Sequence, residues 1–250
     1  MSSMSGNGSR LARRSFLTRL GAGATAFGAA FGAGAQTAGA QSPQPSRSVQ
    51  SAGAPSAAGH WEPARHAEDD WFDQPSARHR FFFDTTNAVG FGEAIIFANN
   101  FFTANKAGYG LAETDLSVVI CARHQSTAFA FSDAMWAKYG AQLAERASFM
   151  DPKTKQPPVI NVFQGTGYEA LLSSRGIALD VVLKKGARLA VCQMATRACA
   201  ATIAGKMGGT VDDIYKELTE HLVPNAHMVP AGIVAVNRAQ EHGYAFAYAG

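Results

Sequence analysis

The chain has 250 residues, 47% of them hydrophobic, and carries 22 Lys and Arg against 19 Asp and Glu, a formal net charge of +3. Four of the arginines lie in residues 1–40, which contain no acidic residue, so the rest of the chain is close to neutral. Because that remainder has no cluster of Lys and Arg, the sequence argues against nucleic acid as a partner. Gly and Ala dominate the most apolar stretch, so no stable membrane anchor is predicted.

Residues 1–40 are predicted to be a twin-arginine signal peptide. In the stretch "ARRSFLTRL", the paired Arg13 and Arg14 are followed by Ser, Phe and Leu, and a weakly apolar Gly/Ala segment comes next. A charged segment, a short apolar segment and a site of small residues are the parts of an export signal. We therefore expect the twin-arginine export machinery to deliver the protein to the periplasm, with cleavage after Ala35 or Ala40.

Residues 41–76 are rich in Ser, Ala, Gly and Pro and then become acidic. This composition predicts a linker or a loosely attached arm. Within it, Trp61, Trp71 and Phe72 are large aromatic residues that could fix the arm to a domain surface. Residues 77–250 have a length that suits one domain, and they contain no internal repeat.

Strand and helix patterns alternate along this domain, as judged from the spacing of apolar residues and from Gly and Pro at segment ends. In chain order the predicted elements are a strand at 80–85, a helix at 91–106, a strand at 116–122, a helix from Ser126 or Thr127 to Tyr139 that stops at Gly140, a flap at 151–175 with a short helix near 169–174, a helix at 177–185, a strand at 187–192, helices from about 194 and at 211–222, a strand at 227–230, a helix at 231–242 and a strand at 244–250.

Buried strands joined by crossover helices are typical of a parallel sheet that is covered on both faces. The predicted fold class is therefore α/β. We expect a three-layer α/β/α domain with a mostly parallel sheet of about five strands, flavodoxin-like or Rossmann-like in shape.

Ligands of open parallel sheets bind beyond the carboxyl ends of the strands. The residues that follow the predicted strands at that edge are Asp84, Thr85, Thr86 and Asn87 after the first, Cys121, Arg123, His124 and Gln125 after the second, Cys192 and Gln193 after the third, and Pro230 and Gly232 after the fourth. Cys192 lies between a strand end and a helix start, where unpaired N–H groups and the helix dipole favour a thiolate. The competing interpretation is a buried cysteine that packs as a small hydrophobic residue.

The other two cysteines are predicted to be structural. Cys121 ends an apolar run and is expected in the core. Cys199 follows Cys192 by two helical turns, a rise of ~10 Å, which is too long for a disulfide. A bridge between Cys192 and Cys121 stays open if their strands are neighbours. No metal site and no cofactor is predicted, because the cysteines are not in close pairs and no dinucleotide or phosphate-loop motif occurs.

Two C-terminal stretches carry a family resemblance. In "LKKGARLAVC", a helix ends at Gly186 and an apolar strand ends at Cys192. In "LVPNAHMVPAGIVAVNRAQEHGYAFAY", a V-P-A-G sequence at 229–232 begins a helix, and Gln240 precedes Gly-Tyr at 243–244. This pattern resembles the DsrE/DsrF-like family of small sulfur-relay proteins.

The resemblance implies a parallel-sheet α/β/α fold, a homo-oligomer and, at the position of Cys192, a cysteine that carries persulfide sulfur. The first hypothesis is therefore an exported sulfane-sulfur carrier or sulfurtransferase-like protein that uses Cys192. Its partners would be a sulfur donor or acceptor protein, or a small sulfur anion. The residues expected to bind or orient an anionic donor, or to stabilise the thiolate, are Arg123, His124, Asp84, Asn87 and Gln193.

Two other hypotheses stay open at this point. The protein could be a non-catalytic periplasmic binding or assembly module of the same fold, in which Cys192 is structural. It could also be a redox protein in which Cys192 pairs with Cys121. The sequence does not decide between an enzyme and a non-catalytic protein.

Overall fold

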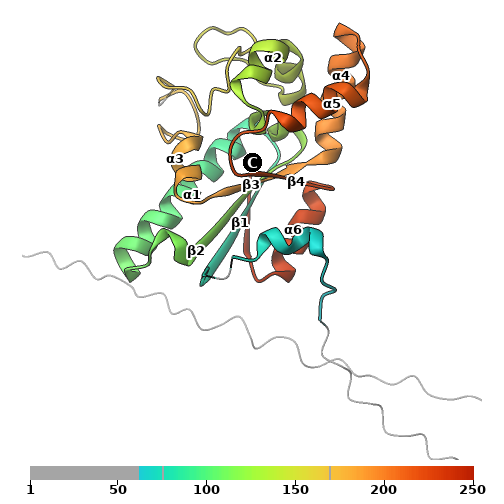
Figure 1. Cartoon of the computed structure of the whole chain (residues 1–250). Coiled ribbons are helices and arrows are strands. Elements are labelled where there is room, and N and C mark those ends of the chain that lie inside the picture. The colour runs from blue at the N-terminus through green and yellow to red at the C-terminus, as the bar shows by residue number, and fades with distance from the viewer. Residues whose placement is uncertain (1–61, 75, 169) are drawn as a thin grey trace, which may run out of the picture. The chain divides into compact units, whose positions relative to one another are not determined.

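A computed structural model describes residues 62–74, 76–168 and 170–250. Its centre is a five-stranded sheet in the order β4-β3-β2-β1-β5, in which all neighbouring strands are parallel (Figure 1). The strands are β1 (His79–Thr85), β2 (Leu116–Ala122), β3 (Arg188–Cys192), β4 (Ala226–Val229) and β5 (Ala245–Ala249). The predicted three-layer α/β/α fold is confirmed.

Helices cover both faces of the sheet. They are α1 (Ala88–Tyr109), α2 (Asp133–Ala147), α3 (Leu179–Lys184), α4 (Gln193–Met207), α5 (Val211–Glu220) and α6 (Gly232–Glu241). The chain steps from β1 to β4 in one direction, so right-handed crossovers place α1 to α5 on one face. It then returns to the far side of β1 for β5, which puts α6 on the opposite face (Figure 1).

The central elements follow from local sequence. All seven residues of β2 are buried, as expected for a strand between two helical layers. Helix α1 begins where the Asn87 side chain accepts a hydrogen bond from Gly90 N, and it ends at Gly110 in the left-handed conformation. A Cβ at Gly90 would lie 2.1 Å from the carbonyl oxygen of Ala249, so this glycine lets α1 lie directly against β5.

The predicted helix from Ser126 or Thr127 to Tyr139 is wrong. A 3₁₀ helix, η3 (His124–Ala130), follows β2, and α2 begins only after Ser132. The two hydroxyl groups that were expected to cap a helix are buried and donate to backbone carbonyl groups at the ends of β1 and β2 instead. The serine and threonine therefore hold the strand ends together, and the helix starts one turn later.

The flap at 151–175 contains turns and loops, and the predicted short helix is wrong for 170–174, the part of it that the structure describes. The flap lies close against α2, because a Cβ at Gly140 would be 2.1 Å from the carbonyl oxygen of Pro158. Tyr139, where the predicted helix ends, has the non-helical angles φ −122° and ψ 18°, so the predicted stop at Gly140 coincides with a kink, beyond which α2 continues to Ala147. The fully buried Asn161 fixes the flap further by donating to two backbone carbonyl groups at the end of η3.

The last part of the predicted arm folds onto the sheet. Within the described residues, a 3₁₀ helix, η1 (Ala67–Phe72), packs on the face that carries α6. Phe72 is fully buried, with its ring centroid 6.4 Å from that of Phe82 and 5.6 Å from that of Tyr244. This segment therefore supplies part of the third layer.

Arg188 fixes η1 in place. Its guanidinium donates to the carbonyl oxygens of Trp71 and Phe72, and also to the hydroxyl groups of Ser117 and Tyr244 at 2.9 Å. Burial lowers the pKa of Arg188. Cations stabilise the carbonyl end of a helical segment, and this arginine occupies that position.

Two predictions concern residues outside the described part of the chain. These are the export signal at 1–40 and the anchoring role of Trp61. Among the helices that the structure does describe, none has the length and hydropathy needed to cross a membrane.

Candidate functional site

The carboxyl ends of the parallel strands form one edge of the sheet, and the predicted site residues lie along it. Strand pairing places Asp84 of β1 opposite Cys121 of β2. The pairing of β2 with β3 ends one position before Arg123 and Cys192, so these two residues lie at the same level of neighbouring strands. The predicted edge of the sheet therefore brings a carboxylate, a guanidinium and two thiols together.

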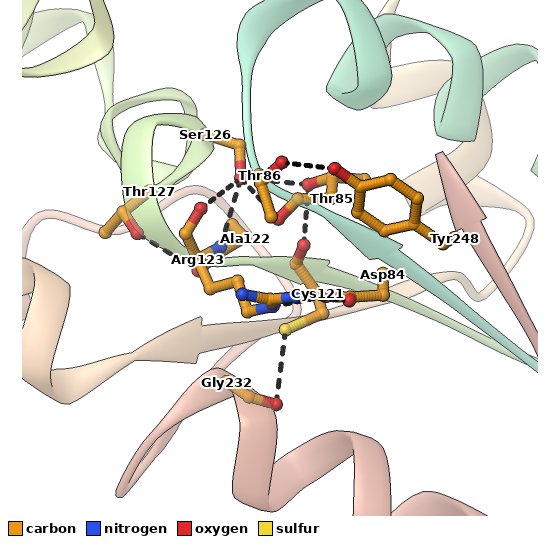
Figure 2. Close-up of polar contacts among 10 residues, drawn as sticks. All are labelled: Asp84, Thr85, Thr86, Cys121, Ala122, Arg123, Ser126, Thr127, Gly232 and Tyr248. Atoms are coloured by element: carbon orange, nitrogen blue, oxygen red, sulfur yellow. Dashed lines mark hydrogen bonds and ion pairs between the residues drawn. The ribbon is translucent and has the colours of Figure 1, made fainter. Parts of the chain in front are cut away.

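Asp84 and Arg123 form a two-point ion pair at this edge (Figure 2). Arg123 Nε and Nη2 each lie 2.7 Å from a carboxylate oxygen. The Asp84 side chain is 3% exposed and that of Arg123 is 25% exposed. The hydrogen bond to Asp84 raises the pKa of Arg123. The guanidinium extends toward β1, on the far side of β2 from Cys192, and no described residue bonds to its Nη1.

Helix α6 begins directly over this ion pair. A Cβ at Gly232 would lie 2.5 Å from the Cβ of Arg123, so glycine is required at this first helical position. The residue before it, Ala231, provides no side-chain cap for the helix. The first N–H groups of α6 are therefore free to interact with an anion beside Arg123.

A group of hydroxyls holds the ion pair in position (Figure 2). Ser126 Oγ accepts a hydrogen bond from Arg123 N at 3.0 Å and lies 2.9 Å from Thr85 Oγ1. The hydroxyl groups of Thr86 and Tyr248 lie 2.8 Å apart and join β1 to β5. These contacts fix the backbone of three strands around the edge, so the guanidinium has a defined direction.

Cys192 is the N-cap residue of α4, which has 15 residues. Its Sγ accepts a hydrogen bond from the backbone N–H of Ala195 at 3.4 Å, and its carbonyl oxygen accepts one from Thr196 Oγ1 at 3.0 Å. The residue is 6% exposed. The sulfur therefore lies at the positive end of the α4 dipole and accepts one of the helix's first N–H groups.

The other two thiols are held in the neutral form. Burial raises the pKa of Cys121 well above its usual value, and it raises the pKa of Cys199 to about 11. All three cysteines are free. Cys121 pairs with Ala190, two residues before Cys192. Strand spacing and rise then put the Cα atoms of Cys121 and Cys192 roughly 8 Å apart, which is too far for a disulfide.

The remaining predicted site residues lie around the ion pair or away from it. Asn87 caps α1 and lines a cavity of about 230 Å³ between α1, the end of α2 and the flap, which Cys192 does not line. His124 is exposed in the left-handed conformation, with φ of 57°. Gln193 is the first residue of α4. Of the predicted set, the structure joins only Asp84 and Arg123 by direct contact.

Sequence reasoning missed two residues and one close contact of this edge. Ser126 was assigned to a helix cap, and Tyr248 was treated only as a strand residue. Gly232 is expected at this edge after the fourth strand, but its close contact with Arg123 is not, although a glycine at a helix start, where residues of higher helix propensity are available, can indicate such a contact. Hydroxyl pairing between Ser126 and Thr85 has no signal in sequence, because it depends on which strands become neighbours.

No known protein family, curated protein or solved structure matches this chain. Within the described residues, no group of three or more His, Cys, Asp or Glu side chains is placed to hold a metal ion. The site is thus defined by a thiol at one helix N-terminus, and by an ion pair beneath the uncapped N-terminus of another. The chemistry that this arrangement supports is the binding of an anionic group beside Arg123, and nucleophilic attack by the sulfur of Cys192 on an electrophilic atom.

Proposed function

We propose that this chain is an exported sulfane-sulfur carrier in which Cys192 accepts and passes on one sulfur atom. The observation that carries the proposal is the hydrogen bond from Ala195 N to Cys192 Sγ at the start of α4. The same N–H group and the helix dipole stabilise a thiolate, which is the nucleophilic form of cysteine. The neighbouring thiols at Cys121 and Cys199 lack this support, since burial holds them neutral.

The step is a thiol exchange that needs no oxidant. The Cys192 thiolate attacks the terminal sulfur of a donor persulfide, R–S–SH, and a bond forms between Sγ and that sulfur. The bond between the two donor sulfurs breaks, and the electron pair leaves on the donor as R–S⁻. Cys192 then holds the persulfide S–SH, and attack by an acceptor thiolate on its outer sulfur regenerates the Cys192 thiolate.

The surrounding edge supports a donor that carries negative charge. Arg123 Nη1 and the first N–H groups of α6 are donors without a bonded partner among the described residues. Both can donate hydrogen bonds to a small sulfur anion, or to the thiolate of a partner protein, at this edge of the sheet. Asp84 sets the direction of Arg123, and the exposed His124 and the half-buried Gln193 border the same edge.

The resemblance to the DsrE/DsrF-like family, which spans roughly His79 to the C-terminus and is densest from Leu183 on, supports the same proposal. The twin-arginine pattern at 1–40 supports export, and it indicates that the domain folds in the reducing cytoplasm before it meets an oxidising compartment. Free cysteines without a neighbouring thiol in disulfide reach suit such a route.

The second candidate is a non-catalytic binding or assembly module with a structural Cys192. The observation that favours it is burial: Cys192 is 6% exposed, and its sulfur already satisfies an N–H group at the helix start. In this alternative the sulfur has the role that a serine hydroxyl has at an N-cap.

Native-state alkylation separates the two candidates. With iodoacetamide at pH 8, we expect Cys192 of the folded protein to react at least about tenfold faster than either other cysteine, because burial raises the pKa of Cys121 and Cys199 and leaves them less exposed than Cys192. Peptide mass mapping locates the label. The matched controls are Cys121→Ala and Cys199→Ala, which should retain the fast reaction. If Cys192 reacts only after unfolding, the carrier proposal fails and the structural alternative is favoured.

A further inference from the structure

The two edges of the sheet differ in how they are protected. β4 is short, carries His227 and is followed directly by Pro230, and the ring of Trp71 stacks on His227 with centroids 4.5 Å apart. β5 has the sequence AFAYA, with no charge and no proline. Natural proteins use charges, proline, short strands or covering segments to prevent edge pairing. β4 has these features, and β5 has none of them within the described residues.

Apolar side chains are exposed on both sides of the β5 edge. Phe246 and Tyr248 are 42% and 52% exposed and lie on the face that carries α6, since Ala247 and Ala249 between and beyond them pack with the opposite core. On that opposite face, Phe97 of α1 is 45% exposed. Phe97, Phe246 and Tyr248, together with strand β5, form a surface that we term the β5 edge.

The position of Phe97 follows from the helix. Gly90 of α1 lies against Ala249 of β5, and Phe97 is two helical turns farther along, on the same side of α1. This side is therefore turned toward β5, and the centroid of the Phe97 ring lies 6.3 Å from that of Phe83 on the neighbouring strand β1. A partner strand added at β5 would meet aromatic side chains on both of its faces.

We propose that the β5 edge pairs with the β5 edge of a second copy of this chain. The two strands run antiparallel about a two-fold axis through Ala247, which extends the sheet from five strands to ten. Phe246 of each copy then lies opposite Tyr248 of the other, and aromatic cross-strand pairs stabilise such a ladder. Strand β5 itself carries no charged side chain, so pairing of the two strands buries no charge of either strand, whereas an acidic or basic peptide finds no opposite charge on β5.

Sedimentation velocity of the full chain over a concentration series tests this interface. We expect a dimer in the wild type, and Phe246→Glu should raise its dissociation constant at least about tenfold, because it places a charge in an apolar contact. Met207→Glu is the matched control, since Met207 is similarly exposed, at 54%, but lies on α4. That variant should dimerise like the wild type.

Two further measurements show whether the dimer forms through β5. In the double variant Phe246→Glu with Tyr248→Lys, opposite charges face each other across the two-fold axis, and dimerisation should recover. Hydrogen exchange at β5 amides should slow as the wild-type concentration rises. A wild type that stays monomeric at every concentration overturns the proposal. A dimer also overturns it if Phe246→Glu leaves the dissociation constant unchanged and the β5 amides exchange at the same rate at every concentration.

Discussion

Arg123→Met lowers the free energy of unfolding by about 3 kcal/mol, because it leaves the Asp84 carboxylate buried without its partner. Asp84 is 3% exposed and both of its oxygens are bonded to the guanidinium. Methionine keeps an aliphatic chain beneath Gly232, so most of the loss measures the unpaired charge rather than lost packing. Urea unfolding at pH 7, followed by circular dichroism, gives the free energy directly.

A double-mutant cycle isolates the ion pair from other effects. Asp84→Asn combined with Arg123→Met removes both charges, so the double variant should be more stable than the sum of the single losses predicts, by about 2 kcal/mol. Additive losses would mean that the two side chains do not stabilise each other. In that case the pair does not organise the edge, and the direction assigned to Arg123 is wrong.

Phe72→Ala lowers the free energy of unfolding by about 3 to 4 kcal/mol, the usual cost of removing a fully buried phenyl ring. Phe72 packs against the sheet beside α6 and covers a part of that face that α6 does not cover. A flexible linker would give no such loss. Urea unfolding measures the change, and Tyr109→Ala at a 79% exposed position is the control, with an expected effect within about 0.5 kcal/mol.

Removal of the anchor gives an independent check of the docked segment. Arg188→Met leaves the carbonyl groups of Trp71 and Phe72 without their donor. Proteolysis should then cleave near η1 sooner than in the wild type, while the rest of the domain stays resistant. Equal cleavage rates in Phe72→Ala, Arg188→Met and the wild type would contradict the docking of this segment.

The fold could be predicted because burial and chain connectivity specify it. β2 is apolar except at Ser117, which is typical of a strand between two helical layers, and its predicted bounds agree with the structure. The start of α2 could not be predicted in the same way. Ser126 is a good capping residue in sequence, but here its hydroxyl bonds to groups on β1 and β2. Gly140 looked like a helix end because nothing local indicates that Pro158 approaches it.

The site could be predicted only in outline. Parallel strands bring their carboxyl ends to one edge, so Asp84, Arg123 and Cys192 were expected there together. The sequence could not specify that Arg123 turns toward Asp84 on β1, because that depends on strand order and on the close approach of Gly232. The offset between Cys121 and Cys192 depends on strand register in the same way.

Intact-mass measurement after incubation with glutathione persulfide tests the role of Cys192 most directly. The full-length wild-type chain and Cys199→Ala should each gain the mass of one sulfur atom, and a thiol acceptor should remove it. Cys192→Ala should gain none. A wild type that gains no sulfur, or a Cys192→Ala variant that gains as much as the wild type, would contradict the assignment of Cys192 as the sulfur-carrying residue.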